Sequence, residues 1–185
     1  MSEQRVFVIT GAAGSGKTTV RNYLTKEFNM PKVITHTTRA PRIHEEDGVD
    51  YYFESEDSFG DNHYLESVSY AGNRYGSSFE GLDEAWKSSD FITIVLDTAG
   101  AITYKRELGD KAVVIFLKVD DSSTLLQRMK TRGDDTQTLA DRIKSDEYLR
   151  DLTLPEELKG NAFVINNNDW ERTKHIVNDI VAKYK

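Results

Sequence analysis

Short apolar runs recur along this 185-residue chain and are separated by segments with helical spacing. The runs are rich in valine, isoleucine and phenylalanine without polar alternation, which is typical of strands buried on both faces of a parallel sheet. They cover residues 6–10, 32–34, 91–96, 112–117 and 163–165. The pattern predicts an α/β fold in which roughly five parallel strands are flanked by helices.

Apolar side chains at helical spacing fill the segments between these runs. The stripes are Val20, Tyr23, Leu24 and Phe28; Phe79, Leu82, Ala85 and Trp86; Leu125, Leu126 and Met129; Leu139, Ile143 and Tyr148; and Trp170, Val177, Ile180, Val181 and Tyr184. Each stripe predicts one helix, and the third follows a capping group at residues 121–123. The fourth predicts a single helix that contains both Leu139 and Tyr148.

Residues 35–78 interrupt this alternation. They are rich in tyrosine, glycine and acidic residues, with strand-like pieces at 51–53 and 65–70. We expect a small mixed β insertion here, within a single domain of 185 residues whose core is formed by residues 1–34 and 79–185. A polar stretch at 132–138 marks a second irregularity, between two helical patterns.

Composition excludes several classes of function. Asp and Glu number 31 against 24 Lys and Arg, a formal net charge of −7. Such a surface repels phosphodiester backbones and anionic lipids, so we expect neither nucleic acid nor a membrane as partner. The absence of cysteine excludes disulfides, thiolate metal sites and thiol catalysis. With no apolar run long enough to span a bilayer and no N-terminal resemblance to a secretory signal, we expect a cytoplasmic protein, monomeric or homodimeric.

The most specific motif lies between the first apolar run and the first helical stripe. It fits G-x-x-x-x-G-K-[ST] and consists of Gly11, Ala12, Ala13, Gly14, Ser15, Gly16, Lys17 and Thr18. Such a loop directs backbone N–H groups at phosphate oxygens. Lys17 is expected to reach the β- and γ-phosphates of ATP, and the Thr18 hydroxyl to help hold Mg²⁺. The motif alone fits a kinase, a GTPase switch or an ATP-driven machine equally well.

A pair of arginines adds a second candidate phosphate site. Arg39 and Arg42 lie three residues apart, on either side of Pro41. Guanidinium groups bind phosphate oxygens in a bidentate manner, so this pair is able to clamp a second phosphate. A solvated turn with ordinary surface arginines is the alternative interpretation of this fragment taken alone.

The order of further motifs favours the phosphate interpretation. The chain reads T-T-R-A-P-R-I-H-E at residues 37–45, G-V-D-Y-Y-F at 48–53, L-E at 65–66 and Y-G-S at 75–77. With the phosphate loop, this set resembles the guanylate kinase family, whose motifs are T-T-R-x-P-R-x-G-E, G-x-D-Y-x-F, a Phe/Leu-x-E segment and Y-G-[ST]. The similarity continues through R-M-K-T-R-G at 128–133 and covers nearly the whole chain.

The resemblance implies a role for each matching residue. For the monophosphate it implies Thr35, Arg39, Arg42, Tyr51, Glu66, Tyr75, Ser77 and Asp97, with Glu66 accepting from the N1–H and 2-amino groups of guanine. For ATP it implies the phosphate loop, Thr19 and Asn166; for Mg²⁺, Thr18 and Asp97. The implied catalytic residues are Lys17, Arg39, Arg128, Arg132 and Arg142. The last three belong to a helical lid of about residues 128–150 that closes over the ATP phosphates.

Structural roles are the alternatives for several of these residues. Tyr51 and Tyr75 fit packing aromatics of the insertion, and Glu66 fits an exposed strand position. Asp97 fits a cap at the end of a buried strand. Asp134 and Asp135 are alternative partners for the lid arginines.

The chain departs from the family in the region that meets the base. Ala99 stands where the family has a second aspartate that contacts guanine, and His44 replaces a glycine. Thr35 stands where a serine is common, and the stretch at residues 59–66 is shorter than usual. None of these changes touches the phosphoryl chemistry. A kinase for another monophosphate, such as dTMP or a pyrimidine nucleotide, is therefore the alternative function.

We expect ATP-dependent phosphorylation of a nucleoside monophosphate, GMP or dGMP first, giving the diphosphate. An acceptor phosphate is already ionised at neutral pH, so the reaction needs positioning and charge neutralisation rather than a general base. A non-catalytic guanylate-kinase-like binding module fits less well, because the phosphate loop is intact. A nucleotide switch has no use for the second phosphate site at Arg39 and Arg42.

Overall fold

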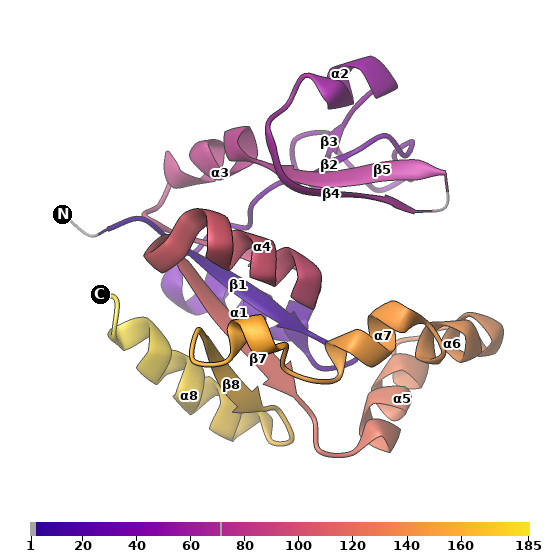
Figure 1. Cartoon of the computed structure of the whole chain (residues 1–185), viewed down its shortest axis with the longest axis vertical. Helices are drawn as coiled ribbons and strands as arrows, with labels where there is room; N and C mark the ends of the chain where they lie inside the picture. Colours follow the sequence, from indigo (N-terminus) through magenta and orange to yellow (C-terminus); the bar gives the residue numbers. More distant parts are fainter. Residues whose placement is uncertain (1–2, 71) are drawn as a thin grey trace.

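The computed structural model describes residues 3–70 and 72–185 of the chain, which contain two four-stranded sheets (Figure 1). All strands of the first sheet run parallel. In spatial order they are β6 (Phe91–Val95), β1 (Arg5–Gly11), β7 (Ala112–Lys118) and β8 (Ala162–Asn166). The predicted α/β class is confirmed, and the carboxyl ends of these strands meet at the edge where open α/β sheets bind ligands.

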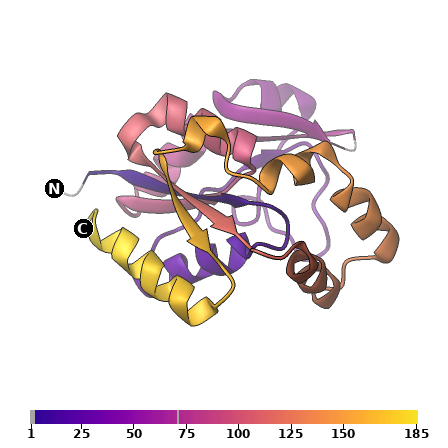
Figure 2. The same cartoon turned by 60° about the horizontal axis from the view of Figure 1, so that its bottom comes forward.

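Helices cover both faces of the parallel sheet, because successive side chains of each strand point to opposite sides. Val6 and Val8 of β1 face α3 (Phe79–Trp86) and α4 (Thr98–Leu108). Phe7 and Ile9 face α1 (Lys17–Phe28) and α8 (Trp170–Ala182), which lie side by side on the other face (Figure 2). The non-alternating apolar runs are thus explained by burial on both faces.

The predicted strand at residues 32–34 is reduced to one isolated bridge, between Lys32 and Thr93 of β6. Thr93 N–H donates to the Pro31 carbonyl at 2.9 Å, and Val33 N–H donates to the Thr93 carbonyl at 2.8 Å. Because Pro31 has no N–H to donate, strand pairing does not extend before it, and the chain then continues into β2 of the second sheet. The first sheet therefore has four strands in the described residues rather than the expected five or so.

The region predicted as a single helix around Leu139 is two helices, which corrects the sequence expectation. They are α6 (Thr136–Ile143) and α7 (Asp146–Asp151), and they follow α5 (Ser122–Thr131). Ser145 breaks the run, because its backbone is extended and its hydroxyl caps α7 by accepting from Tyr148 N–H. These three helices project beyond the ends of β1 and β7 (Figure 1).

The second sheet lies within residues 35–78, where a mixed β region was expected. Its strands in spatial order are β3 (Tyr52–Phe53), β2 (His36–Thr37), β5 (Asn73–Ser78) and β4 (Tyr64–Tyr70). β2 pairs parallel with β3 and antiparallel with β5, so the sheet is mixed. The short helix α2 (Glu56–Gly60) is an addition that the sequence did not indicate.

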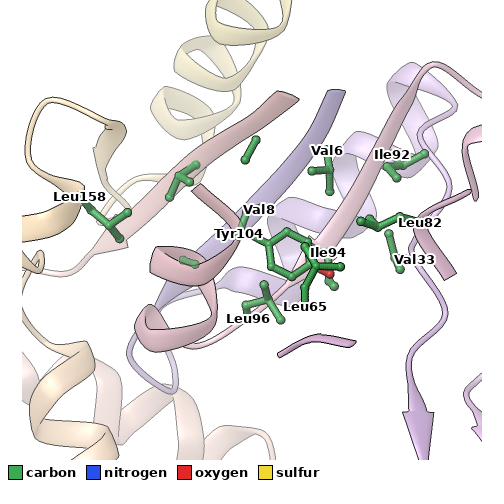
Figure 3. Close-up of a cluster of buried hydrophobic side chains, with 13 residues drawn as sticks. Val6, Val8, Val33, Leu65, Leu82, Ile92, Ile94, Leu96, Tyr104 and Leu158 are labelled. Atoms are coloured by element: carbon green, nitrogen blue, oxygen red, sulfur yellow. The ribbon is translucent and has the colours of Figure 1, made fainter. Parts of the chain in front are cut away.

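One side chain of the second sheet belongs to the main core. Leu65 of β4 is buried with Val33, Leu82, Ile94 and Tyr104 (Figure 3). Short one-turn helices at Gly109–Lys111 and Glu156–Leu158 precede β7 and β8. No helix within the described ranges has the length and apolar character needed to cross a bilayer.

Candidate active site

The phosphate loop joins β1 to α1 at the carboxyl edge of the sheet. Gly11, Gly14 and Gly16 all have positive φ, at 140°, 82° and 99°. A Cβ on Gly11 would lie 2.5 Å from the Leu117 carbonyl oxygen, so this position admits only glycine. The glycine pattern is therefore explained by backbone geometry, which leaves the first N–H groups of α1 available to an anion.

Lys17 is the first residue of α1, and its ammonium group donates to the Gly11 carbonyl at 2.6 Å. Burial lowers the pKa of Lys17, while Asp151 and Asp97 raise it and Arg132 and Arg142 lower it. Asp97 follows β6, Asp151 ends α7, and the two arginines belong to the segment predicted as a lid. The fold thus brings the loop lysine, two carboxylates and two of the predicted lid arginines into one electrostatic neighbourhood.

Two of the three predicted lid arginines share a carboxylate partner. Arg132 Nη2 lies 2.6 Å from Asp134 Oδ2, and Arg142 Nη1 lies 3.2 Å from the same oxygen. The hydrogen bond from Arg132 lowers the pKa of Asp134 below its usual range. Asp134, the alternative partner suggested by the sequence, holds both guanidinium groups together beside Lys17.

Arg128 has a different environment from the other two arginines. Its guanidinium donates to the Asn167 carbonyl at 2.8 Å and to the Gly14 carbonyl at 3.3 Å. Arg128 therefore ties α5 to the backbone of the phosphate loop. From this position it braces the loop that the nucleotide would contact.

Asn167, which follows the predicted ATP-binding residue Asn166, contacts the phosphate loop. Asn166 ends β8 with an exposed side chain, whereas Asn167 is buried. Asn167 Nδ2 donates to the Ser15 carbonyl at 2.8 Å, and its Oδ1 accepts from the Thr173 hydroxyl at 2.8 Å. The asparagine run at residues 166–168 was visible in the sequence, but only the burial of its middle member distinguishes it.

Asp97 lies between β6 and α4 and serves as the cap that the sequence offered as an alternative. Its Oδ1 accepts from Gly100 N–H at 2.7 Å, and its Oδ2 lies 3.2 Å from Arg150 Nη2. The neighbouring Asp151 accepts from the Thr98 hydroxyl and forms an ion pair with Arg150 at 3.0 Å. Arg150 and Asp151 were not identified from the sequence, because no motif marks them.

The predicted magnesium ligands are compatible with the ion but do not enclose it. Thr18 supplies a hydroxyl in the first turn of α1, and Asp97 supplies a partly exposed carboxylate near Lys17. The described part of the chain contains no group of three acidic or histidine side chains arranged to hold a metal. Mg²⁺ commonly takes one or two protein oxygens and completes its shell with phosphates and water, so this donor set fits it.

On the acceptor side, Arg39 is fixed in a tight turn. Its Nη2 lies 2.9 Å from Glu45 Oε1, and Glu45 Oε2 accepts from Arg42 N–H at 2.9 Å. The hydrogen bond from Arg39 lowers the pKa of Glu45 to about 2, and the same bond raises the pKa of Arg39. Glu45 is the last residue of the T-T-R-A-P-R-I-H-E motif, and its contacts fix the Arg39 side chain and the Arg42 backbone.

Two tyrosines surround the Arg39 guanidinium. It lies 5.5 Å from the ring centre of Tyr51, in a cation–π contact, and the hydroxyl of Tyr75 contributes to its raised pKa. The Tyr51 and Tyr75 rings are 6.4 Å apart. The fold therefore brings together three of the residues predicted to hold the monophosphate.

A cavity of about 350 Å³ lies between the phosphate-loop helix and the second sheet. Its lining includes Thr18 of α1, Thr35 before β2, and Glu45 and Tyr51. Arg42 has an exposed side chain at the turn that carries Glu45. Thr18 of the predicted donor site and Thr35 and Tyr51 of the predicted acceptor site thus line the same cavity.

Glu66 and Ser77 face each other across β4 and β5. Ser77 Oγ donates to Glu66 Oε1 at 2.9 Å. Burial raises the pKa of Glu66, and the nearby Asp97 raises it further, while the Ser77 bond opposes both effects. Glu66 is thus partly buried rather than the exposed strand residue of the alternative interpretation.

Comparisons with known proteins agree on one family. The family model described as "Guanylate kinase" matches residues 3–184. A guanylate kinase of Chlamydia abortus is 35% identical over 184 residues, covering 95% of this chain and 86% of the relative; one of Chlorobaculum tepidum is 30% identical, covering 100% and 95%. The crystal structure of guanylate kinase from Anaplasma phagocytophilum superposes with a TM-score of 0.64 at 26% identity, covering 99% of this chain and 87% of that one.

Proposed function

This chain belongs to the guanylate kinase family, and on that premise we propose that it transfers the γ-phosphoryl group of ATP to GMP, giving ADP and GDP. The observation that carries the proposal is the shared cavity, because Thr18 of the phosphate-loop helix and Tyr51 of the acceptor side line the same space. A nucleotide on each side would bring the two reacting phosphates together.

On the donor side, the backbone N–H groups of the phosphate loop and the ammonium of Lys17 would hold the ATP phosphates. Arg132 and Arg142 already act electrostatically on Lys17, so they are placed to neutralise charge that develops on the transferred group. Arg128 would keep the loop in shape through its bonds to Gly14 and Asn167.

Thr18 and Asp97 would hold Mg²⁺ together with phosphate oxygens and water. When bound, the ion would neutralise part of the negative charge of the ATP phosphates. The partly exposed Asp97 carboxylate is near Lys17, so it lies at the edge of the donor phosphates.

On the acceptor side, Arg39 would hold the phosphate of the monophosphate with Arg42, Tyr51 and Tyr75. Glu45 keeps Arg39 in place before substrate arrives, which lowers the entropy lost on binding. Thr35, Ser77 and Glu66 would meet the base. A carboxylate such as that of Glu66 is able to accept from two adjacent N–H donors, which guanine presents and adenine does not.

The test is an ADP-release assay in which GMP, dGMP, AMP, CMP, UMP and dTMP are supplied separately with ATP and Mg²⁺. Turnover with GMP or dGMP supports the proposal. Turnover with dTMP or a pyrimidine nucleotide, but not GMP, would reject guanine specificity alone, and no turnover with any monophosphate would reject kinase activity. A Lys17→Met variant prepared in parallel shows whether the measured ADP comes from this chain.

A further inference from the structure

Tyr104 is a fully buried tyrosine near the middle of α4. Its ring packs among Val8, Ile94 and Leu65 in the main core (Figure 3). The packing explains the ring, but a phenylalanine would pack equally well. The hydroxyl is buried and forms no hydrogen bond of acceptable geometry within the described residues. Because an unpartnered buried hydroxyl destabilises the folded state, its presence here calls for a reason.

The surroundings of this hydroxyl point toward the second sheet. Burial raises the pKa of Tyr104 strongly, the Ser77 hydroxyl lowers it, and the Glu66 carboxylate raises it. Both residues lie close enough to act on the phenol, and α4 packs directly against β4, which carries Glu66. Tyr104, Ser77 and Glu66 therefore form a row of polar groups that runs from the core to the base-binding side.

Ser77 is the central member of this row. It has a single hydroxyl proton, and it donates that proton to Glu66 Oε1. Its oxygen lone pairs remain able to accept, and the nearby Tyr104 hydroxyl is a donor in need of a partner. A bond from Tyr104 to Ser77 would hold the Ser77 proton on Glu66 and so fix the carboxylate's orientation.

We propose that Tyr104 is a positioning residue for the base of the monophosphate, acting through Ser77 on Glu66. The Tyr104–Ser77 bond closes when the nucleotide is bound, as hydrogen bonds of a resting active site commonly tighten in the substrate complex. The proposal rests on the function proposed above, because it assigns Glu66 to the base. Asp97 raises the pKa of Glu66, and the Glu66 carboxylate in turn raises the pKa of Tyr104.

The test is a Tyr104→Phe variant, which removes the hydroxyl and keeps the ring. GMP is compared with inosine monophosphate, which lacks the 2-amino donor. We expect the ratio of their kcat/KM values to fall about two- to tenfold, the range of one hydrogen bond, with the KM for ATP unchanged. Tyr23→Phe is the matched control, because the Tyr23 hydroxyl donates to Asn178 at a distant exposed site.

A second comparison places Tyr104→Phe in a Ser77→Ala background. A relay through Ser77 predicts no further loss there, whereas an added loss equal to that in the wild-type background overturns it. A Tyr104→Phe enzyme that matches Tyr23→Phe in the GMP to inosine monophosphate ratio also overturns the inference. In both cases wild-type turnover of GMP persists, so this failure is distinct from failure of the proposed function.

Discussion

Replacement of Asn167 by alanine tests how the phosphate loop is held. The Asn167 side chain joins the Ser15 carbonyl of the loop to the Thr173 hydroxyl of α8, and all three residues are buried. The substitution leaves the backbone bonds of residue 167 to Lys118 and Arg128 in place. It therefore removes the two side-chain bonds and little else.

The magnitude follows from the two groups that lose their partners. A buried donor or acceptor left without a hydrogen bond costs about 1–3 kcal/mol. With one unpartnered group at Ser15 and one at Thr173, we expect Asn167→Ala to lower the free energy of unfolding by about 2–6 kcal/mol. Loosening of the loop should also raise the KM for ATP about three- to tenfold, equivalent to roughly 0.7–1.4 kcal/mol of binding.

Thr173→Val is the matched control, since it breaks the Asn167–Thr173 bond and leaves the bond to Ser15 intact. We expect it to lower the free energy of unfolding by about 1–2 kcal/mol with little change in the KM for ATP. Urea unfolding at neutral pH and steady-state kinetics measure both quantities. Equal ATP KM values for the two variants would refute the reasoning that Asn167 holds the loop for nucleotide binding.

Three further perturbations test the charges around the site. The pKa of Glu45 is lowered to about 2 from 4.5, so its ion pair with Arg39 stabilises the fold above about pH 4.5, and this stabilisation is lost as the pH falls toward 2. Glu45→Gln removes the ion pair at every pH, so its stability should fall less than that of the wild type over this range in acid unfolding experiments. The same acid unfolding curve for variant and wild type would contradict this account. Lys17→Met should reduce turnover at least about 100-fold. The free energy of unfolding should stay the same or rise, because burial disfavours the Lys17 charge, and a marked loss of stability would be inconsistent with this account. Asp134→Asn should release the two predicted lid arginines that it binds, which lowers the KM for ATP and leaves the urea unfolding midpoint nearly unchanged. A higher KM for ATP would argue that Asp134 orders them productively.

The fold was predictable to the extent that one pattern decided each element. Strands buried on both faces have apolar runs, and four of the five predicted runs are strands of the first sheet. The strand predicted at residues 32–34 is only an isolated bridge, because strand pairing also depends on the path of the following residues, which local composition does not encode. The prediction of one continuous helix through Ser145 was wrong for a related reason. The apolar stripe crosses Ser145, and only the cap geometry separates the two helices.

The site was predictable where a motif imposes a local geometry. The phosphate loop has the expected setting between a strand and a helix, because the glycine conformations fix it. Contacts between distant segments were not predictable in this way. Asn167 and Tyr104 acquire their neighbours from packing of α8 and α4, and a single sequence gives no signal for such pairs.

Leu65 has a consequence for how the acceptor region evolves and is engineered. Because this β4 residue fills the main core beside Leu82 and Tyr104, residues 35–78 are not a transplantable module. Excising them would leave a hole in the core and strand an apolar side chain in water, a change of about 1.5–3 kcal/mol for the leucine alone. A graft of substrate preference from another protein would have to bring its matching α4 and α3 surfaces with it. In this chain, a change of the region that selects the substrate also changes the core on which the stability of the fold depends.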